Sequence, residues 1–104
     1  MKKTRLLFII SIAVSLISQL ALADQKLATE KNCMTCHTVE KKLLGPGFKD
    51  VSAKYANQKE AIDKLSNKIL KGSTGVWGTI PMPANAQVNE AEARKLASWI
   101  LSLK

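Results

Sequence analysis

The chain has 104 residues, of which 46% are hydrophobic and 23% charged, with 16 basic and 8 acidic side chains, two cysteines and one histidine. This length allows a single domain. The composition excludes a disulfide-stapled scaffold, a multi-cysteine zinc module and a collagen-like or disordered chain, and it leaves little room for an enzyme's substrate pocket. A formal net charge of +8 would ordinarily suggest a nucleic-acid partner, but the basic residues are unevenly distributed.

Residues 1–23 have the organisation of a secretory signal peptide. Three basic residues at the start precede an uncharged segment, 6–17, and a small-residue A-x-A site that ends at Ala23. An uncleaved membrane anchor is the alternative, but an apolar run of about a dozen residues is shorter than the roughly 20 that span a bilayer. We therefore predict cleavage after Ala23 and a mature periplasmic domain at 24–104, with 81 residues and a net charge of +5 from 13 basic and 8 acidic side chains. For an exported product of this charge, neither nucleic acid nor stable membrane insertion is expected.

The mature region predicts an all-α fold made of short helices. A first short helix is expected at residues 25–32. Gly72 stands where a helix C-terminus favours a residue that tolerates positive φ, and Asn89 with Glu92 forms the pattern of a capping box. Apolar residues recur at the helical spacing of three and four in three further places: Phe48, Val51 and Tyr55; Ile62, Leu65 and Ile69; and Leu96, Trp99, Ile100 and Leu103.

A long segment from Gly72 to Asn85 separates the last two predicted helices. Its three glycines and two prolines exclude a helix. Disorder is the alternative, but Val76, Trp77 and Ile80 make the segment too apolar for that. Domains of this size often need a cofactor to complete their core, so we expect the segment to pack on a bound group.

The sequence Cys33-Met34-Thr35-Cys36-His37 is the attachment signature of c-type haem, C-x-x-C-H. Two thiols three residues apart on one helical turn can add to the two vinyl groups of a porphyrin, and the adjacent imidazole can reach the iron. A thioredoxin-like site is the first alternative, but it needs a βαβ setting. A zinc or copper site is the second, and Met82 would then be the remaining candidate ligand.

The occupant of the iron's sixth position decides what such a haem does. An open position suggests gas binding or peroxidase chemistry, whereas a methionine favours electron transfer. The mature chain has two methionines, and Met34 lies inside the attachment motif, where it cannot reach the opposite haem face. Met82 lies between Pro81 and Pro83, which fix its backbone. We predict Met82 as the sixth ligand, the alternative being a core-filling methionine.

With these motifs in place, the chain resembles the small bacterial monohaem class I cytochromes c of the c-551/c-552 type. The resemblance covers essentially the whole mature chain and rests on four stretches: C-M-T-C-H, L-L-G-P-G-F-K-D-V, K-G-S-T-G-V-W-G-T-I-P-M-P-A-N and A-R-K-L-A-S-W-I-L-S. It implies a compact fold of four to five short helices around one covalent haem c, with thioether bonds from Cys33 and Cys36 and axial ligation by His37 and Met82.

The resemblance also implies three supporting residues. The carbonyl of Pro46 would accept the other imidazole N–H and so fix the ring. Trp77 would hydrogen-bond a haem propionate, and Asn85 would lie near the methionine sulfur. Two positions depart from the family pattern: Asn32 replaces a usual glycine, and residues 24–32 contain no aromatic side chain. We expect Leu27 to pack against Trp99 in place of that aromatic.

A haem with both axial positions filled predicts a one-electron carrier, and by resemblance a monomer that shuttles between respiratory proteins. Donors would be cytochrome bc-type complexes, and acceptors a nitrite reductase, a terminal oxidase or a cytochrome c peroxidase. A haem enzyme or gas sensor with a labile methionine, and a thiol- or metal-handling protein, are the alternatives. Six lysines are candidates to steer acidic partners unless they serve only solubility: Lys31, Lys41, Lys42, Lys49, Lys68 and Lys71.

Overall fold

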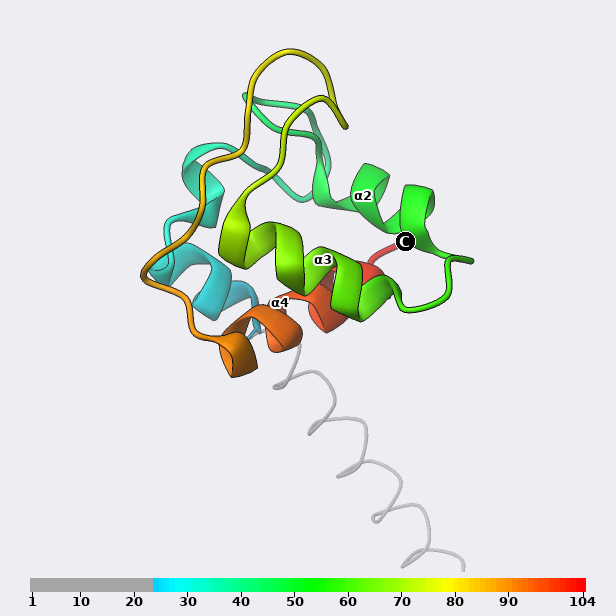
Figure 1. The fold of residues 1–104 in the computed structure, drawn as a ribbon. Coiled ribbons are helices and arrows are strands. Elements are labelled where there is room, and N and C mark those ends of the chain that lie inside the picture. Colours follow the sequence, from blue (N-terminus) through cyan, green and yellow to red (C-terminus); the bar gives the residue numbers. More distant parts are fainter. Residues whose placement is uncertain (1–23) are drawn as a thin grey trace, which may run out of the picture.

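The computed structural model describes residues 24–104, and within this range the chain is helical, with no strand beyond an isolated bridge. The predicted all-α fold is therefore confirmed. The predicted signal peptide, 1–23, lies outside the described residues. In chain order (Figure 1), the elements are a helical segment at 24–30, the 3-10 turn η1 (Cys33–Thr35), α2 (Phe48–Tyr55), α3 (Ala61–Lys71) and α4 (Glu90–Ser102).

The ends of the two longest helices follow the predicted signals. Helix α3 is followed by Gly72 with φ +78°, a left-handed value that glycine adopts without strain. Helix α4 begins at a capping box: Glu92 N donates to Asn89 Oδ1 (2.8 Å), and Asn89 N donates to Glu92 Oε1 (3.1 Å). These bonds satisfy backbone donors that have no partner inside the helix.

Two helix ends fall earlier than the sequence indicated. The first helical segment stops at residue 30, because Asn32 adopts a left-handed conformation (φ +66°) that turns the chain into η1. Helix α4 ends at Ser102, and Leu103, predicted as the last residue of its buried stripe, lies in extended backbone and is only half-buried.

Helix α4 is the centre of the core and packs against both α2 and α3. Trp99 of α4 is buried and meets the ring of Phe48 from α2 edge to face, with centroids 5.5 Å apart. The first segment contributes Ala28, which is fully buried, while Leu27 is partly buried against the same core. Thus α2 supplies an aromatic partner for Trp99, and the contact of Leu27 with Trp99 stays a prediction.

Within residues 24–104, the structure contains no helix with the length and apolar character needed to cross a membrane.

Candidate functional site

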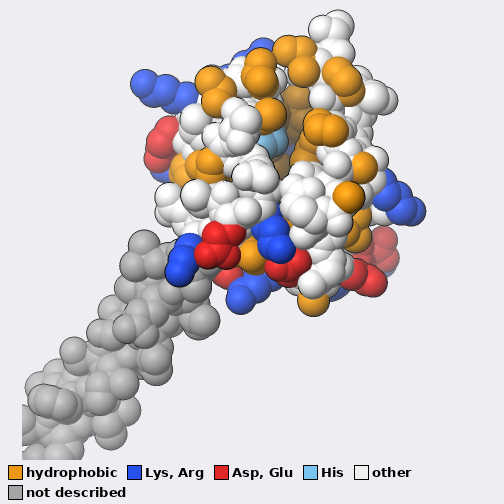
Figure 2. Space-filling view, turned by 90° about the vertical axis from the view of Figure 1, so that its left-hand side faces the viewer, with side chains coloured by type: hydrophobic (Ala, Val, Ile, Leu, Met, Phe, Trp, Pro, Cys, Tyr) orange, Lys and Arg blue, Asp and Glu red, His pale blue; other side chains and the backbone are white. Residues whose placement is uncertain are grey.

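A cavity of about 550 Å³ opens between the segment that carries the cysteines and the long segment after α3. Figure 2 shows it as a hollow with hydrophobic side chains around its mouth and the histidine inside. The seven residues singled out from the sequence all line it: Cys33, Cys36, His37, Pro46, Trp77, Met82 and Asn85. The fold therefore brings together residues that are up to 52 positions apart, and their roles toward a haem remain predictions.

The His37 ring is held by hydrogen bonding and by stacking. Its Nδ1 lies 2.8 Å from the carbonyl oxygen of Pro46. A carbonyl can only accept, so Nδ1 carries the proton and Nε2 keeps a free lone pair, the form in which imidazole binds metals. The ring also stacks on Phe48, with centroids 4.8 Å apart and planes 21° from parallel. The hydrogen bond and the stacking thus fix the orientation of the His37 ring and leave Nε2 as the nitrogen without a partner among residues 24–104.

Gly45 allows the loop before α2 to pass close to this ring. A Cβ at Gly45 would overlap Cε1 of His37 and lie 2.8 Å from its Nδ1. The Gly45 amide donates to the carbonyl of Cys36 (2.8 Å), which fixes this close approach. Gly45 was not singled out from the sequence, and its place before Pro46 in the G-P-G stretch was the available signal.

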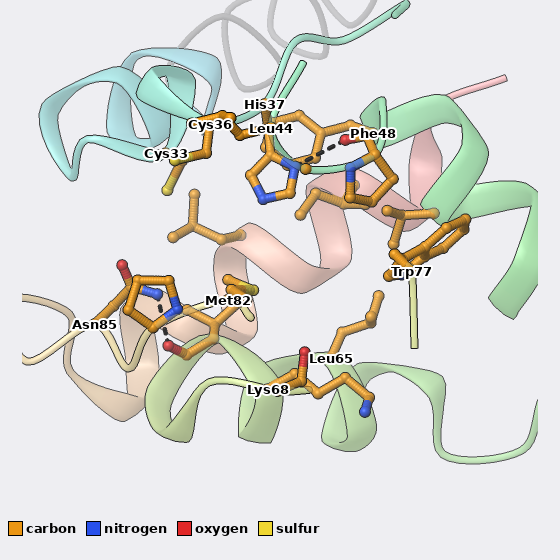
Figure 3. Close-up of a pocket in the computed structure, with 18 of the residues that line it drawn as sticks. Cys33, Cys36, His37, Leu44, Phe48, Leu65, Lys68, Trp77, Met82 and Asn85 are labelled. Carbon is orange, nitrogen blue, oxygen red and sulfur yellow. Dashed lines mark hydrogen bonds between the residues drawn. The ribbon is translucent and has the colours of Figure 1, made fainter. Parts of the chain in front are cut away.

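Cys33 begins the single turn η1 and Cys36 directly follows it (Figure 3), and both cysteines are half-buried. Asn32 reaches the left-handed conformation required before this turn, which asparagine tolerates better than most residues. Burial raises the pKa of the Cys33 thiol. A thioredoxin-like site needs a βαβ setting, and residues 24–104 contain no strand beyond the isolated bridge, which disfavours that alternative.

Met82 lies across the cavity from His37 (Figure 3). Its backbone is paired with Ser73 through two hydrogen bonds of 2.9 and 3.0 Å, the isolated bridge of the fold. A Cβ at Gly72 would overlap the carbonyl oxygen of Met82, so glycine is required where the two sides of the loop come together. The flanking prolines indicated a fixed Met82, but nothing in the sequence pattern indicated Ser73 as its partner.

Asn85 and Trp77 occupy two other positions on the wall. The Asn85 side-chain amide donates to the carbonyl of Ile69 at the end of α3 (2.8 Å), and its backbone amide reaches the same oxygen (3.2 Å). Asn85 therefore anchors the Met82 segment to α3 with one of its two amide hydrogens. Trp77 lies at the mouth, 38% exposed, with the ammonium of Lys54 5.2 Å from its ring centroid.

Lys68 and Gln87 line the cavity but were not assigned to it from the sequence. Lys68 is the one charged side chain among the described lining residues. Of the other predicted steering lysines, Lys31 pairs with Glu92 (3.1 Å) and Lys49 with Glu40 (2.6 Å). Lys41, Lys42 and Lys71 are exposed.

The cavity suits a large, flat, apolar group with a metal at its centre. Its volume is within the range of small-molecule and cofactor sites. Leu44 and Ile80 at its mouth are 54% and 60% exposed, which is unusual for large apolar side chains unless a ligand or a partner covers them. Cys33, Cys36, His37 and Met82 line the same space, and thiol, imidazole and thioether groups are among those that attach and ligate haem.

Comparison with known proteins identifies the family. The family model for cytochrome c matches residues 23–104. The chain is 48% identical to cytochrome c-552 of Nitrosomonas europaea, over 98% of this chain and 99% of that protein. It is 47% identical to cytochrome c-552 of Hydrogenobacter thermophilus, over 89% and 94% of the two chains.

Solved structures give the same result for the fold. The crystal structure of wild-type Nitrosomonas europaea cytochrome c552 superimposes with a TM-score of 0.76 at 52% identity, covering 77% of this chain and 99% of that one. A class 1 cytochrome from Sideroxydans lithotrophicus matches with a TM-score of 0.64 at 30% identity, covering 78% and 92%. With its C-x-x-C-H motif, the chain therefore belongs to the cytochrome c family and is a small electron-transfer protein that carries one covalently bound haem c.

Proposed function

We propose that Cys33 and Cys36 hold the haem through thioether bonds and that His37 and Met82 ligate its iron from opposite sides. The observation that carries this proposal is the state of His37: the Pro46 carbonyl fixes its Nδ1 proton, and the remaining nitrogen is available on the cavity side. Met82 on the far wall supports it, since a second donor stands opposite the first.

The remaining lining residues would support this arrangement. Pro46 would raise the basicity of the imidazole and fix its orientation by accepting the Nδ1 hydrogen. Asn85 would hold the Met82 segment against α3 and offer its second amide hydrogen to the sulfur side of the cavity. Trp77 and Lys68 would provide an N–H donor and a positive charge to the propionate groups.

When bound, the haem supplies a one-electron Fe(II)/Fe(III) couple. The chain's contribution is to keep the surroundings of the iron the same in both states. The Ser73–Met82 bridge and the His37–Pro46 bond hold the two ligand-bearing segments. The neutral sulfur of Met82 and the apolar lining disfavour additional positive charge, which raises the reduction potential.

We further propose that the chain is a carrier and not itself an enzyme, because two fixed side chains would leave the iron no open position for a substrate. The alternative, a haem enzyme or gas sensor, requires the Met82 bond to be absent or labile. Its paired backbone, its two flanking prolines and the anchoring of Asn85 favour the closed form.

The signal-like residues 1–23 support export, cleavage after Ala23 and work in the periplasm. By resemblance to its relatives, the mature protein would be a monomer. The partners would be respiratory proteins: a cytochrome bc-type complex as donor, and a nitrite reductase, terminal oxidase or cytochrome c peroxidase as acceptor. The mass of the protein isolated from a periplasmic extract tests the cleavage. A mature N-terminus at Asp24 is expected, and an intact Met1 terminus would contradict it.

The replacement Met82→Ala tests the axial ligand. We expect the ferric protein to lose the weak red-edge absorption of a sulfur-ligated haem, and its reduction potential to fall because a softer, neutral ligand is removed. The reduced variant should bind carbon monoxide readily at neutral pH, whereas the wild type should not. Visible spectroscopy and redox titration measure these changes.

Met34→Leu is the matched control, since Met34 is the other mature methionine and packs against the core. It should keep the wild-type spectrum and potential. An unchanged spectrum in Met82→Ala, or ready carbon monoxide binding by the wild type, would remove the ligand assignment.

A further inference from the structure

Two residues that are 56 positions apart in the sequence join the opposite walls of the cavity at one edge. The side-chain amide of Gln87 donates to the backbone carbonyl of Lys31 (2.8 Å). In return, the ammonium of Lys31 donates to the backbone carbonyl of Gln87 (3.1 Å). Each side chain thus binds the other residue's backbone. We call this pair the 31/87 latch.

Both ends of the latch are anchored. The Lys31 ammonium also contacts Glu92 Oε2 of α4 (3.1 Å), and Lys31 lies two residues before the first cysteine of the attachment motif. At the other end, the Gln87 amide also donates to Asn85 Oδ1 (3.1 Å), and Asn85 is bonded to the end of α3. The latch therefore connects the cysteine segment to the Met82 segment through groups that are themselves held.

Few hydrogen bonds connect the two walls. Among the hydrogen bonds of residues 24–104, the two bonds of the latch are the ones that connect segment 73–88 to segment 31–47. Met82 is held to its own loop by Ser73 and to α3 through Asn85, but neither bond reaches the wall that carries His37. Gln87 also lines the cavity, five residues after Met82.

We propose that Gln87 is a positioning residue: with Lys31 it closes the Met82 segment over the cavity and so sets how often the methionine leaves the iron. This inference rests on the proposed ligation by Met82. It also means that the side chain of Lys31 is occupied in holding the site together, and so is not free to steer partners. Opening of the latch precedes opening of the segment.

Native-state hydrogen exchange on the holoprotein tests the latch directly. In Gln87→Ala, the amides of Met82 and Asn85 should exchange about fivefold faster, the factor for losing one net hydrogen bond of about 1 kcal/mol. The buried Leu96 amide in α4 reports global unfolding, and we expect the change there to be smaller. Gln87→Met keeps the length but has no donor, and it should behave like Gln87→Ala.

Gln58→Ala is the matched control. Gln58 is an equally exposed glutamine that also makes two side-chain hydrogen bonds, to Lys54 and Lys64 (both 3.2 Å), but these span only four and six residues. It should leave the exchange of Met82 and Asn85 at the wild-type rate. Wild-type exchange in Gln87→Met would show that packing, and not hydrogen bonding, matters at this position, and would overturn the latch.

Binding of imidazole to the ferric holoprotein gives the second measurement. Imidazole competes with the sixth ligand, so Gln87→Ala should bind it about fivefold more tightly than the wild type or Gln58→Ala. Equal imidazole affinities together with equal exchange rates would overturn the latch. If Met82→Ala binds imidazole with the wild-type affinity, the proposed ligation by Met82 is contradicted, and imidazole binding no longer reports on the latch. The exchange rates alone then decide whether Gln87 closes the segment.

Discussion

The imidazole of His37 is fixed by three immediate neighbours that act in different ways. Pro46 determines the tautomer by accepting the Nδ1 hydrogen, and Phe48 restricts the tilt of the ring by stacking on it. Gly45 contributes because it has no side chain: its backbone lies so close to the imidazole that a Cβ would overlap the ring. Orientation and basicity of a metal-bound histidine depend on such neighbours, so the site's chemistry is sensitive to residues that donate nothing to the iron.

Gly45→Ala should therefore disturb the His37 ring. The added Cβ overlaps Cε1, so either the ring or the loop must move, at about 1–3 kcal/mol of stability for overpacking. A moved ring would also lengthen the Nδ1 bond to Pro46 and alter the visible spectrum and the reduction potential. Urea denaturation and redox titration measure the two effects.

Gly78→Ala separates the two effects. Gly78 has φ +116° with nothing within 4 Å of an added Cβ, and it is not among the residues that line the cavity, so this change strains the backbone without touching His37. It should lower stability by about 1–2 kcal/mol and leave the spectrum unaltered. A Gly45→Ala protein with wild-type spectrum and potential would show that the loop, and not the ring, gives way.

Glu92 makes the stability of the fold depend on pH. Its pKa is lowered from the ordinary value of 4.5, first by the hydrogen bond from the Asn89 amide and then by Lys31. The unfolded chain therefore binds this proton more readily than the folded chain. The contribution is present above the ordinary glutamate value and is lost as the pH falls through the lower pKa of the folded state.

We expect Glu92→Gln to be less stable than the wild type at neutral pH, with a difference that shrinks toward acid. Urea denaturation of both proteins at several values from about pH 3 to pH 7 measures this difference. Because the two proteins share all other titrating groups, the difference isolates Glu92. A difference independent of pH would mean that the carboxylate charge contributes nothing.

At the scale of elements, a buried serine joins α2 to the end of α4. Ser52 Oγ lies 2.7 Å from the carbonyl of Leu103 and 3.1 Å from that of Leu101. Carbonyls in the last turn of a helix have no partner within the helix. Ser52 supplies one from a neighbouring helix, which explains how α4 can end at Ser102 while Leu103 stays against the core.

Ser52→Ala should destabilise the protein by about 1–3 kcal/mol, because half-buried carbonyls lose their donor. Thermal and urea denaturation measure the loss. Ser98→Ala on the exposed face of α4 is the control and should change stability by less than about 0.5 kcal/mol. Equal effects of the two substitutions would contradict the role of Ser52.

At the scale of the whole molecule, the mouth of the cavity is apolar and the charges lie around it (Figure 2). Leu44 and Ile80 at the mouth are exposed, while Lys41 and Lys42 are exposed shortly before that leucine in the chain. An apolar centre with exposed lysines nearby would suit brief docking of acidic redox partners, with charge acting on the rate of encounter.

If these lysines steer anionic partners, oxidation of the reduced protein by the anion ferricyanide should slow as salt is added. Lys41→Gln/Lys42→Gln should lower the rate by about two- to fivefold at low salt and by much less at high salt. Stopped-flow absorbance measures the rates. Lys59→Gln/Lys104→Gln changes net charge equally at two other exposed lysines and should have the smaller effect. Rates independent of salt would leave the lysines a role in solubility alone.

Much of the fold could be predicted because it depends on local pattern. Apart from Leu103, the three helical apolar sets appear in the structure, as do the capping box at Asn89 and Glu92 and the terminating Gly72, since each involves neighbours within one or two turns. The family was recognisable for the same reason: its motifs are short. The early ends of two helices were missed because the left-handed Asn32 and the extended Leu103 depend on the direction of the next segment and on the packing around them.

The sequence by itself determined which chemical groups are available to a haem: two thiols, an imidazole and a proline-flanked methionine are the donors that our proposal assigns to it, and the C-x-x-C-H spacing is a local property. Only the tertiary structure decided what holds those donors in place. The Ser73–Met82 bridge, the Phe48–Trp99 contact and the pair formed by Lys31 and Gln87 connect distant residues. Such contacts depend on how the helices pack and on which distant segments the fold brings side by side, and local periodicity in the sequence encodes neither.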